Sequence, residues 1–283
     1  MRERLRIKRK RKWGRHLSVY ILLILCSLII LFPFYITILV SFKVPLDSKY
    51  SVLALPRVPT VKNYNEVITK GGYFDALKNS AYITVLSTFG AMLINTILSY
   101  FLARNSRKKF FAGAYYFFVM GLFIPFQVVM IPLAIMSRNM NLLNPTGLIV
   151  LYVALSFSTN VFLITGFVKG IPVEMDEAAK MDGCGPFRCF YQIILPMMAP
   201  IVATCTILSV LGYWNDFSLP LIILQTRVGR TLPLFIYNYR TKYLTNYNLA
   251  FAAYVLSMIP PLIAYLFAQK YIIQGMTAGA VKG

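Results

Sequence analysis

The sequence predicts an all-helical integral membrane protein with six transmembrane helices. Three observations predict this fold class: 58% of the 283 residues are hydrophobic, only 13% are charged, and the mean hydropathy is +0.65. Soluble globular domains carry about 25% charged residues, so the balance indicates a bilayer environment. Backbone polar groups in lipid must be paired within each segment, and long uncharged runs are therefore expected to cross as helices.

Six uncharged runs are long enough to cross a bilayer, because a spanning helix needs about 20 predominantly apolar residues. The runs are 17–42, 79–103, 110–137, 139–168, 189–215 and 243–269. The first run is much longer than the apolar core of a cleaved signal peptide, which has about 7–15 residues. No small-residue cleavage site follows it, so we interpret this run as a retained first helix.

The distribution of Lys and Arg orients these helices, since cytoplasmic loops carry an excess of positive charge. Nine basic residues lie in 1–16 and four in 104–109. With the 169–188 loop and the C-terminus, this side holds 18 of the 29. Both termini and that loop are therefore expected in the cytoplasm. The predicted organisation is a basic cytoplasmic tail (1–16), a six-helix transmembrane domain (17–273) and a C-terminal cytoplasmic tail (274–283).

The net charge of +20 raises the question of a nucleic-acid partner. Much of the charge lies in the N-terminal run, which can contact anionic lipid at about 1 kcal/mol per side chain. No base-reading motif accompanies it, so lipid is an expected partner and nucleic acid is not. The chain has four cysteines and one histidine, His16, and these do not supply a zinc ligand set. No metal site is predicted.

Prolines and turn residues punctuate the chain. Segment 43–78 is expected to be a partly ordered external loop or short surface helix. In the third run, either Pro125 or Pro132 could kink the helix by removing a backbone hydrogen bond, or the two could bracket a break. Residues 144–147, Asn-Pro-Thr-Gly, predict a tight external turn. Residues 225–243 predict a basic and aromatic external connection.

The cytoplasmic loop 170–200 is polar and contains four of the nine acidic residues of the chain. Pro172 is expected at the first position of a short helix, where its missing N–H costs nothing. Gly183 is expected to stop that helix in a backbone conformation that other residues adopt poorly. Pro186 is expected to open a second short helix, and Pro196 to mark its junction with the fifth run. We call this segment, 170–200, the elbow. If it is rigid, a displacement of the elbow would be transmitted to both adjoining transmembrane helices.

The same loop contains the spacing E-A-A, three residues, G, nine residues, I-x-L-P. The residues that meet it are Glu177, Ala178, Ala179, Gly183, Ile193, Leu195 and Pro196. This pattern resembles the signature loop of the membrane subunits of ABC importers. Three further stretches resemble the carbohydrate branch, in particular the maltose-type permease subunit: 124–133, 213–217 and 275–283. Cys184 stands where that family commonly has alanine.

The resemblance implies a multi-pass permease subunit of an ATP-driven importer for a sugar or oligosaccharide, in a bacterial or archaeal plasma membrane. The helix that contains the E-A-A residues would sit in a cleft of a separate ATPase subunit. Glu177 would offer a charge, Ala178 and Ala179 would allow close approach, and Gly183 would permit the bend. The complete ATPase-coupling set would be Glu177, Ala178, Ala179, Asp182, Gly183, Ile193, Leu195 and Pro196. The tail 275–283 would reach toward the ATPase dimer.

The implied partners are a second, related permease subunit, two copies of the ATPase, and an extracytoplasmic sugar-binding protein that faces the 225–243 connection. The sequence contains no G-x-x-x-x-G-K-[ST] phosphate loop and no credible catalytic set. The chain is therefore expected to be no enzyme and to hold no cofactor. ATP and Mg²⁺ are expected on the ATPase subunit.

Four polar residues are candidates for the substrate path. Ionisable groups in membrane segments are commonly functional, which favours a position of Asn215 and Asp216 near the path of a sugar. The alternative is that both residues have a packing and capping role. Gln127 and Asn160 either line the pore or form hydrogen bonds between helices.

Two other functions compete with sugar import. The first is an ABC importer permease for another polar solute, such as a polyamine or phosphate. The second is an autonomous channel or ion-driven transporter. That function would need buried charges or half-helix ion sites, and the six runs offer almost none.

Overall fold

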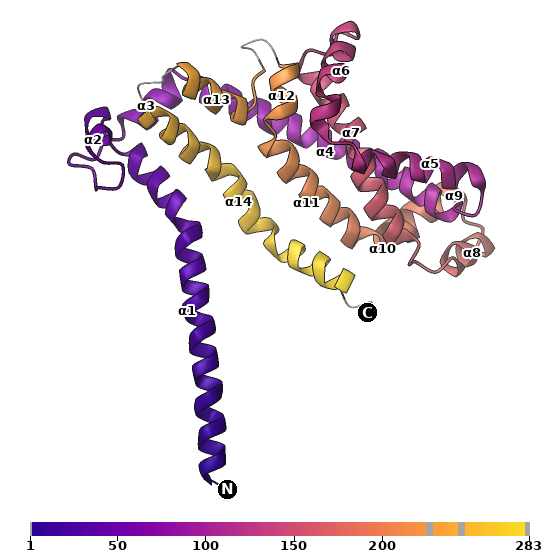
Figure 1. Cartoon of the computed structure of the whole chain (residues 1–283). Coiled ribbons are helices and arrows are strands. Elements are labelled where there is room, and N and C mark those ends of the chain that lie inside the picture. The colour runs from indigo at the N-terminus through magenta and orange to yellow at the C-terminus, as the bar shows by residue number, and fades with distance from the viewer. Residues whose placement is uncertain (1, 225–228, 243–246, 281–283) are drawn as a thin grey trace. The chain divides into compact units, whose positions relative to one another are not determined.

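The computed structural model describes residues 2–224, 229–242 and 247–280, and every regular element in these residues is a helix (Figure 1). The prediction of an all-helical chain is confirmed for them. The chain divides into two compact units, and each is described by itself. The first is Met1–Gly71 with Asn238–Leu256, and the second is Gly72–Tyr237 with Ser257–Gly283.

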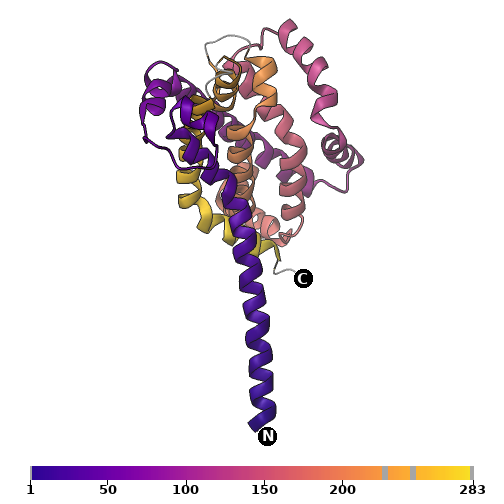
Figure 2. The same cartoon turned by 60° about the vertical axis from the view of Figure 1, so that its left-hand side comes forward.

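The first unit begins with one long helix. This helix, α1 (Arg2–Ser41), is continuous in both views (Figure 1; Figure 2). Two short helices follow in the segment expected to be partly ordered, α2 (Pro45–Tyr50) and α3 (Lys62–Thr69). Of the two alternatives for this segment, a partly ordered loop or a short surface helix, the structure shows short helices.

A buried network of hydrogen bonds around Lys43 fixes the chain after α1. The carbonyl of Lys43 accepts hydrogen bonds from the side-chain amides of Asn63 and Asn248, each at 2.9 Å. The Lys43 ammonium, which is 1% exposed, donates to the carbonyls of Ser51 and Val52, both at 2.9 Å. A buried charge needs such partners. This network therefore gives the segment after α1 a defined path.

The second unit contains the other helices. In chain order they are α4 (Tyr73–Arg104), α5 (Lys109–Met120), the 3₁₀-helix η1 (Gly121–Phe123), α6 (Phe126–Asn139), α7 (Pro145–Val168), α8 (Glu174–Met181), α9 (Pro186–Cys189), the π-helix η2 (Phe190–Ile194), α10 (Leu195–Met197), α11 (Ala199–Asn215) and α12 (Ser218–Ile223). Two more, α13 (Leu232–Lys242) and α14 (Tyr247–Ala280), contribute to both units.

The centre of the second unit is the pair α4 and α7, and α4 also packs against α11. Small and hydroxyl side chains dominate the buried face of α4: Ala76, Ser80, Thr84, Ser87, Thr88, Ala91, Asn95, Thr96 and Ser99. Small residues let helix backbones approach closely, and polar ones hydrogen-bond across the interface. Asn95 Nδ2 does so, donating to Ser156 Oγ of α7 at 2.7 Å.

Three helices are long and apolar enough to span a membrane: Val19–Ser41 of α1, Tyr73–Arg104 and Pro145–Val168. Two bent pairs pass the same test when each pair is taken together. They are Lys109–Phe123 with Phe126–Asn139, bent by 106°, and Pro186–Met197 with Ala199–Asn215, bent by 75°. The described apolar part of α14, Tyr247–Ile263, is shorter. Three of the six predicted runs are thus single helices, and two are helices broken by a bend. The sixth run is a helix whose described apolar part is shorter than the other spans.

The break in the third run lies at Pro125. This residue is extended (φ −60°, ψ 135°) and precedes α6, and Ile124 before it is extended as well (φ −93°, ψ 111°). The ring of a proline disfavours the helical conformation in the residue before it, which explains why η1 ends here. Pro132 lies inside α6 and does not bracket the break. Of the alternatives, Pro125 alone marks the interruption.

The tight turn predicted at 144–147 is wrong, because these residues start α7. Asn144 is the N-cap, and its Oδ1 accepts a hydrogen bond from the Gly147 backbone N–H at 2.9 Å. Pro145 follows at a first-turn position, which suits a residue without an N–H. Gly147 has no room for a side chain, since a Cβ there would lie 2.0 Å from the Leu142 carbonyl oxygen.

Helices also extend further through the C-terminal part than predicted. The connection expected at 225–243 includes α13, although 225–228 and 243 lie outside the described residues. Residues 274–280, expected to begin a separate tail, continue α14 as far as Ala280. Residues 281–283 lie outside the described residues.

Candidate functional site

The candidate site is the elbow 170–200, which folds into two short helices. Its first helix, α8, begins at Glu174 and not at Pro172 as predicted. Pro172 instead opens the turn before the helix, where its carbonyl accepts a hydrogen bond from the Met175 N–H at 3.4 Å. The first turn of α8 carries the acidic side chains of Glu174, Asp176 and Glu177. Negative charge at this end is favourable for the helix dipole.

Gly183 ends α8 as predicted. Its φ of +79° lies in the left-handed region. The Gly183 N–H donates to the Lys180 carbonyl at 3.0 Å, and the Cys184 N–H donates to the Ala179 carbonyl at 3.0 Å. These two bonds form a Schellman motif, which satisfies carbonyls at the helix end and gives the chain a fixed exit direction.

The second helix of the elbow leads into the fifth run. Pro186 opens α9 as predicted. The π-helix η2 follows, a type of element that is rare and often occurs at functional sites. The 75° bend falls between Met197 and Ala199. The junction is therefore two residues beyond Pro196, which lies inside α10.

A buried ion pair fastens α8 to the end of α4. Arg104 Nη2 lies 2.7 Å from Asp176 Oδ2, and the two side chains are only 12% and 5% exposed. Arg104 Nη1 also donates to the Ile171 carbonyl at 2.8 Å. The other Asp176 oxygen accepts a hydrogen bond from the Tyr100 hydroxyl. A pair 72 positions apart leaves no local signal, so the sequence did not predict this contact.

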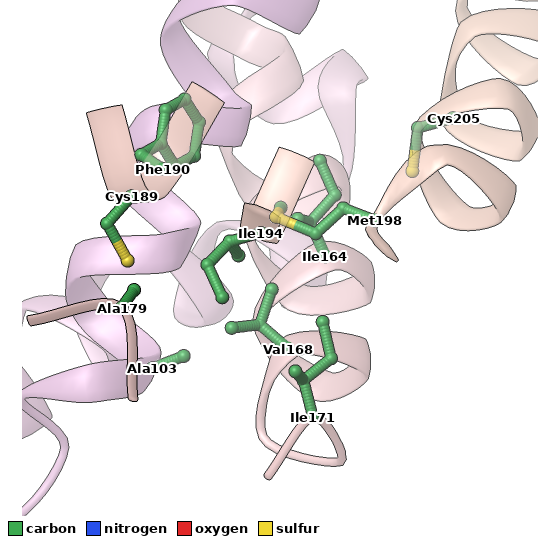
Figure 3. Packing of buried hydrophobic residues seen from close by; sticks show 10 residues of the cluster. All are labelled: Ala103, Ile164, Val168, Ile171, Ala179, Cys189, Phe190, Ile194, Met198 and Cys205. Atoms are coloured by element: carbon green, nitrogen blue, oxygen red, sulfur yellow. The ribbon is translucent and has the colours of Figure 1, made fainter. Parts of the chain in front are cut away.

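An apolar cluster lies beneath the elbow (Figure 3). Its members from the elbow include Ala179, Cys189, Phe190 and Ile194, and those from α4 and the end of α7 include Ala103, Ile164 and Val168. Ala179 is 3% exposed. Its small side chain therefore allows close approach to the chain's own core, whereas Ala178 is exposed.

The exposed residues of α8, of α9 and of the turn between them, which together are called the exposed face of the elbow, are partly apolar. Glu177, Asp182 and Gly183 lie on this face with Ala178. Several large apolar side chains are also exposed here and were not predicted, and the most exposed of them are Met181 at 88% and Phe187 at 77%. In the sequence, such side chains can be recognised as large apolar residues within a polar segment that lies outside the six runs. An exposed apolar surface of this kind, rimmed by polar groups, is typical of a protein interface.

The last three motif residues lie away from this face. Ile193 and Leu195 are partly buried against the apolar cluster. Pro196 is exposed and, with Leu195, lines a groove of about 600 Å³ along the start of α11. The groove is also lined by Tyr191, Ala199, Val202, Ala203, Thr206 and Ile207. The structure thus divides the motif into an exposed part and a packed part.

The four substrate-path candidates are not brought together by hydrogen bonds in the described part of the chain. Asp216 accepts hydrogen bonds from the Tyr152 hydroxyl and the Ser218 N–H, each at 2.9 Å, which matches the packing and capping alternative. Asn215 Nδ2 donates to the Leu211 carbonyl of its own helix at 2.8 Å. Asn160 is buried in α7, and Gln127 is exposed on α6.

Comparison with known proteins decides the family. Residues 95–278 match the family described as the binding-protein-dependent transport system inner membrane component. The chain belongs to this family. The resemblance drawn from the loop motif is thereby confirmed, because this family is the one that contains the membrane subunits of ABC importers.

Relatives of this inner membrane component include sugar permeases. A multiple sugar-binding transport system permease protein of Streptococcus mutans is 41% identical over 268 residues, which is 93% of this chain and 96% of the relative. A probable starch degradation products transport system permease protein of Thermoanaerobacterium thermosulfurigenes is 35% identical over 270 residues, covering 94% and 98%. The chain is thus an ABC transporter permease of the sugar branch.

Two solved structures share the fold. A bacterial ABC transporter involved in the import of the acidic polysaccharide alginate has a TM-score of 0.75 at 22% identity, covering 92% of this chain and 96% of the other. A bacterial alginate ABC transporter in complex with an alginate pentasaccharide-bound periplasmic protein has a TM-score of 0.70 at 16% identity, covering 92% and 93%. These likenesses show the fold alone.

Proposed function

We propose that this permease imports a sugar or oligosaccharide by coupling ATP hydrolysis on a separate ATPase to alternating access of its pore. The exposed face of the elbow carries the proposal. Glu177, Met181 and Phe187 are exposed on a pair of short helices that a buried ion pair and an apolar cluster anchor to the rest of the unit. A surface that is both apolar and rigidly held suits docking, because little ordering entropy is lost on binding.

The proposed topology has six spans with both termini in the cytoplasm. The spans would be formed by α1, α4, the bent pair α5–α6, α7, the bent run α9–α11, and α14. The excess of Lys and Arg on one side supports this orientation. In this arrangement the exposed face of the elbow meets the ATPase from the cytoplasmic side. The other proposed partners are a second permease subunit and an extracytoplasmic binding protein.

A sugar is favoured over a polyamine or phosphate, because relatives of this chain are named as permeases for multiple sugars and for starch degradation products. The described spans agree with an uncharged substrate. Asp216 is the acidic residue at the end of α11, and its carboxylate is already engaged by Tyr152 and Ser218. A cationic substrate would require further carboxylates along the path.

The docking assignment is tested by a double substitution, Met181→Ser with Phe187→Ser. Truncation of the few residues that dominate an interface costs more than about 1 kcal/mol each, so if these two side chains hold the ATPase, it should be recovered with the purified permease at least about tenfold less efficiently. The matched control is Leu46→Ser with Leu55→Ser, since these leucines are 61% and 75% exposed on the segment after α1. Unchanged recovery of the ATPase with the first variant would refute docking on this face.

A further inference from the structure

The Arg104–Asp176 contact is the single ion pair in the described part of the chain, and it joins two segments that the backbone does not connect directly. The elbow is continuous with α7 on one side and with α11 on the other. It has no comparable backbone connection to α4. Any displacement of α8 would therefore reach α7 and α11 through the chain itself, but could reach α4 only through side chains.

We propose that Arg104 is a positioning residue that makes α4 move together with α8 during transport. The inference rests on the proposed function, since it names the route by which motion of the elbow enters the pore helices. Arg104 holds α8 through the Asp176 carboxylate and holds the turn before α8 through the Ile171 carbonyl. The Arg104 side chain thus contacts the elbow at two points.

The geometry favours joint motion over a loose contact. Tyr100, one helical turn before Arg104 on the same face of α4, donates to the second Asp176 oxygen, so both oxygens of the carboxylate are held from one helix. The Tyr100 ring also lies against the Phe190 ring of η2, with centroids 5.2 Å apart. Separating α8 from α4 would leave two charges uncompensated at a site where both are nearly buried, which is strongly unfavourable.

Stability alone does not require a charged pair here. Apolar side chains of similar volume often replace a buried ion pair without loss of stability. They cannot, however, reproduce an ion pair and a hydrogen bond to the two oxygens of one carboxylate together with a hydrogen bond to a backbone carbonyl. A role in transmission therefore predicts that an apolar pair restores assembly of the complex but not coupling.

The first test measures the substrate imported per ATP hydrolysed by the reconstituted complex, together with stimulation of its ATPase by loaded binding protein. Arg104→Met should lower this ratio at least about fivefold, the lower end of typical coupling between sites. Arg104→Met with Asp176→Leu should assemble fully and stay uncoupled. The matched control is Arg107→Met, because Arg107 is exposed and makes no ion pair within the described residues. A normal ratio in Arg104→Met, a normal ratio in the double variant, or loss of assembly in both would overturn the proposal.

The second test measures whether α4 and α8 move as one body. Spin labels are placed at Lys180→Cys on α8 and Phe101→Cys on α4, both exposed positions, after Cys26, Cys184, Cys189 and Cys205 are replaced by alanine. With Arg104 intact, the distance between the labels should be the same in nucleotide-free and ATP-trapped complexes, and with Arg104→Met it should differ. A distance that already changes with Arg104 intact would refute joint motion. The proposed docking could still hold in that case, since recovery of the ATPase tests it separately.

Discussion

The hydroxyl of Tyr152 on α7 donates a 2.9 Å hydrogen bond to the carboxylate of Asp216 at the end of α11. The ring of Tyr152 also stacks on Tyr213 of α11, with centroids 4.5 Å apart and an interplanar angle of 28°. The Asp216 carboxylate further caps the start of α12 by accepting from the Ser218 N–H. One side chain thus ties three helices together, and both of its carboxylate oxygens already accept a hydrogen bond.

Asp216→Ala should therefore destabilise the protein more than it impairs substrate recognition. Removing the acceptor leaves the hydroxyl of the buried Tyr152 unpaired, at a cost of about 1–3 kcal/mol, whereas the exposed Ser218 N–H can pair with water. The apparent midpoint of thermal unfolding in detergent should fall, while the substrate concentration for half-maximal import stays near that of the natural chain. Tyr152→Phe should reproduce part of the loss. A large change in substrate dependence without loss of stability would instead place Asp216 on the substrate path.

The left-handed conformation of Gly183 predicts a position-specific effect of serine. Gly183→Ser should destabilise the end of α8 by about 1–2 kcal/mol, since a side chain is strained at φ +79°. Gly185→Ser should be neutral or slightly stabilising, because Gly185 has φ −68° at the N-cap of α9, where serine is favoured. A Cβ meets nothing within 4 Å at either position, so backbone conformation is the variable that differs. Hydrogen exchange of the α8 amides measures the effect, and equal exchange in the two variants would contradict it.

Gly147 predicts a steric effect at the start of α7. Gly147→Ala places a methyl group 2.0 Å from the Leu142 carbonyl oxygen, so the N-cap must shift, at a cost of about 1–3 kcal/mol. Gly166→Ala in the same helix meets nothing within 4 Å and should be neutral or stabilising, since alanine favours helix. Thermal unfolding of the two purified variants gives the comparison. If both variants unfold at the same temperature, the close contact at Gly147 is not important for stability.

The proposed topology predicts opposite accessibility of two exposed positions. Cysteines at Lys180 on α8 and at Leu55 in the segment after α1 are introduced one at a time into the cysteine-free chain. A membrane-impermeant thiol reagent added outside intact cells should label Leu55→Cys and should reach Lys180→Cys only after the membrane is opened. The excess of basic residues beside the elbow is the physical reason for this orientation. Labelling of Lys180→Cys in intact cells would reverse it.

Much of the elbow could be predicted from the sequence, because its signals are local. Gly183 and Pro186 act through the backbone of their own neighbourhood, and both do in the structure what their residue types favour. Pro172 was misplaced by two residues, since proline is compatible with the turn before a helix as well as with its first turn. The exposure of Met181 and Phe187 was not predicted, because hydropathy averaged over a polar loop does not single out individual apolar residues.

The long-range features could not be predicted. Arg104 and Asp176 lie far apart in the sequence, and each has an adequate local explanation as a positive-inside residue and a helix-start acid. Composition remains apolar across both bends, so the sequence offered the break in the third run only as one of two alternatives and placed the junction of the fifth run two residues before the observed bend. Asn144 shows a related ambiguity, since the residue types that favour a tight turn are the same ones that cap a helix.

The most direct measurement of the central claim is uptake of labelled oligosaccharide by liposomes that contain this chain and its second permease subunit, with and without the ATPase. Uptake should require the ATPase, ATP and loaded binding protein together, and the Met181→Ser, Phe187→Ser variant should lower it at least about tenfold when the ATPase is not in excess. Uptake by the permease subunits alone, at a rate that ATP and the ATPase do not change, would contradict the account and support an autonomous channel.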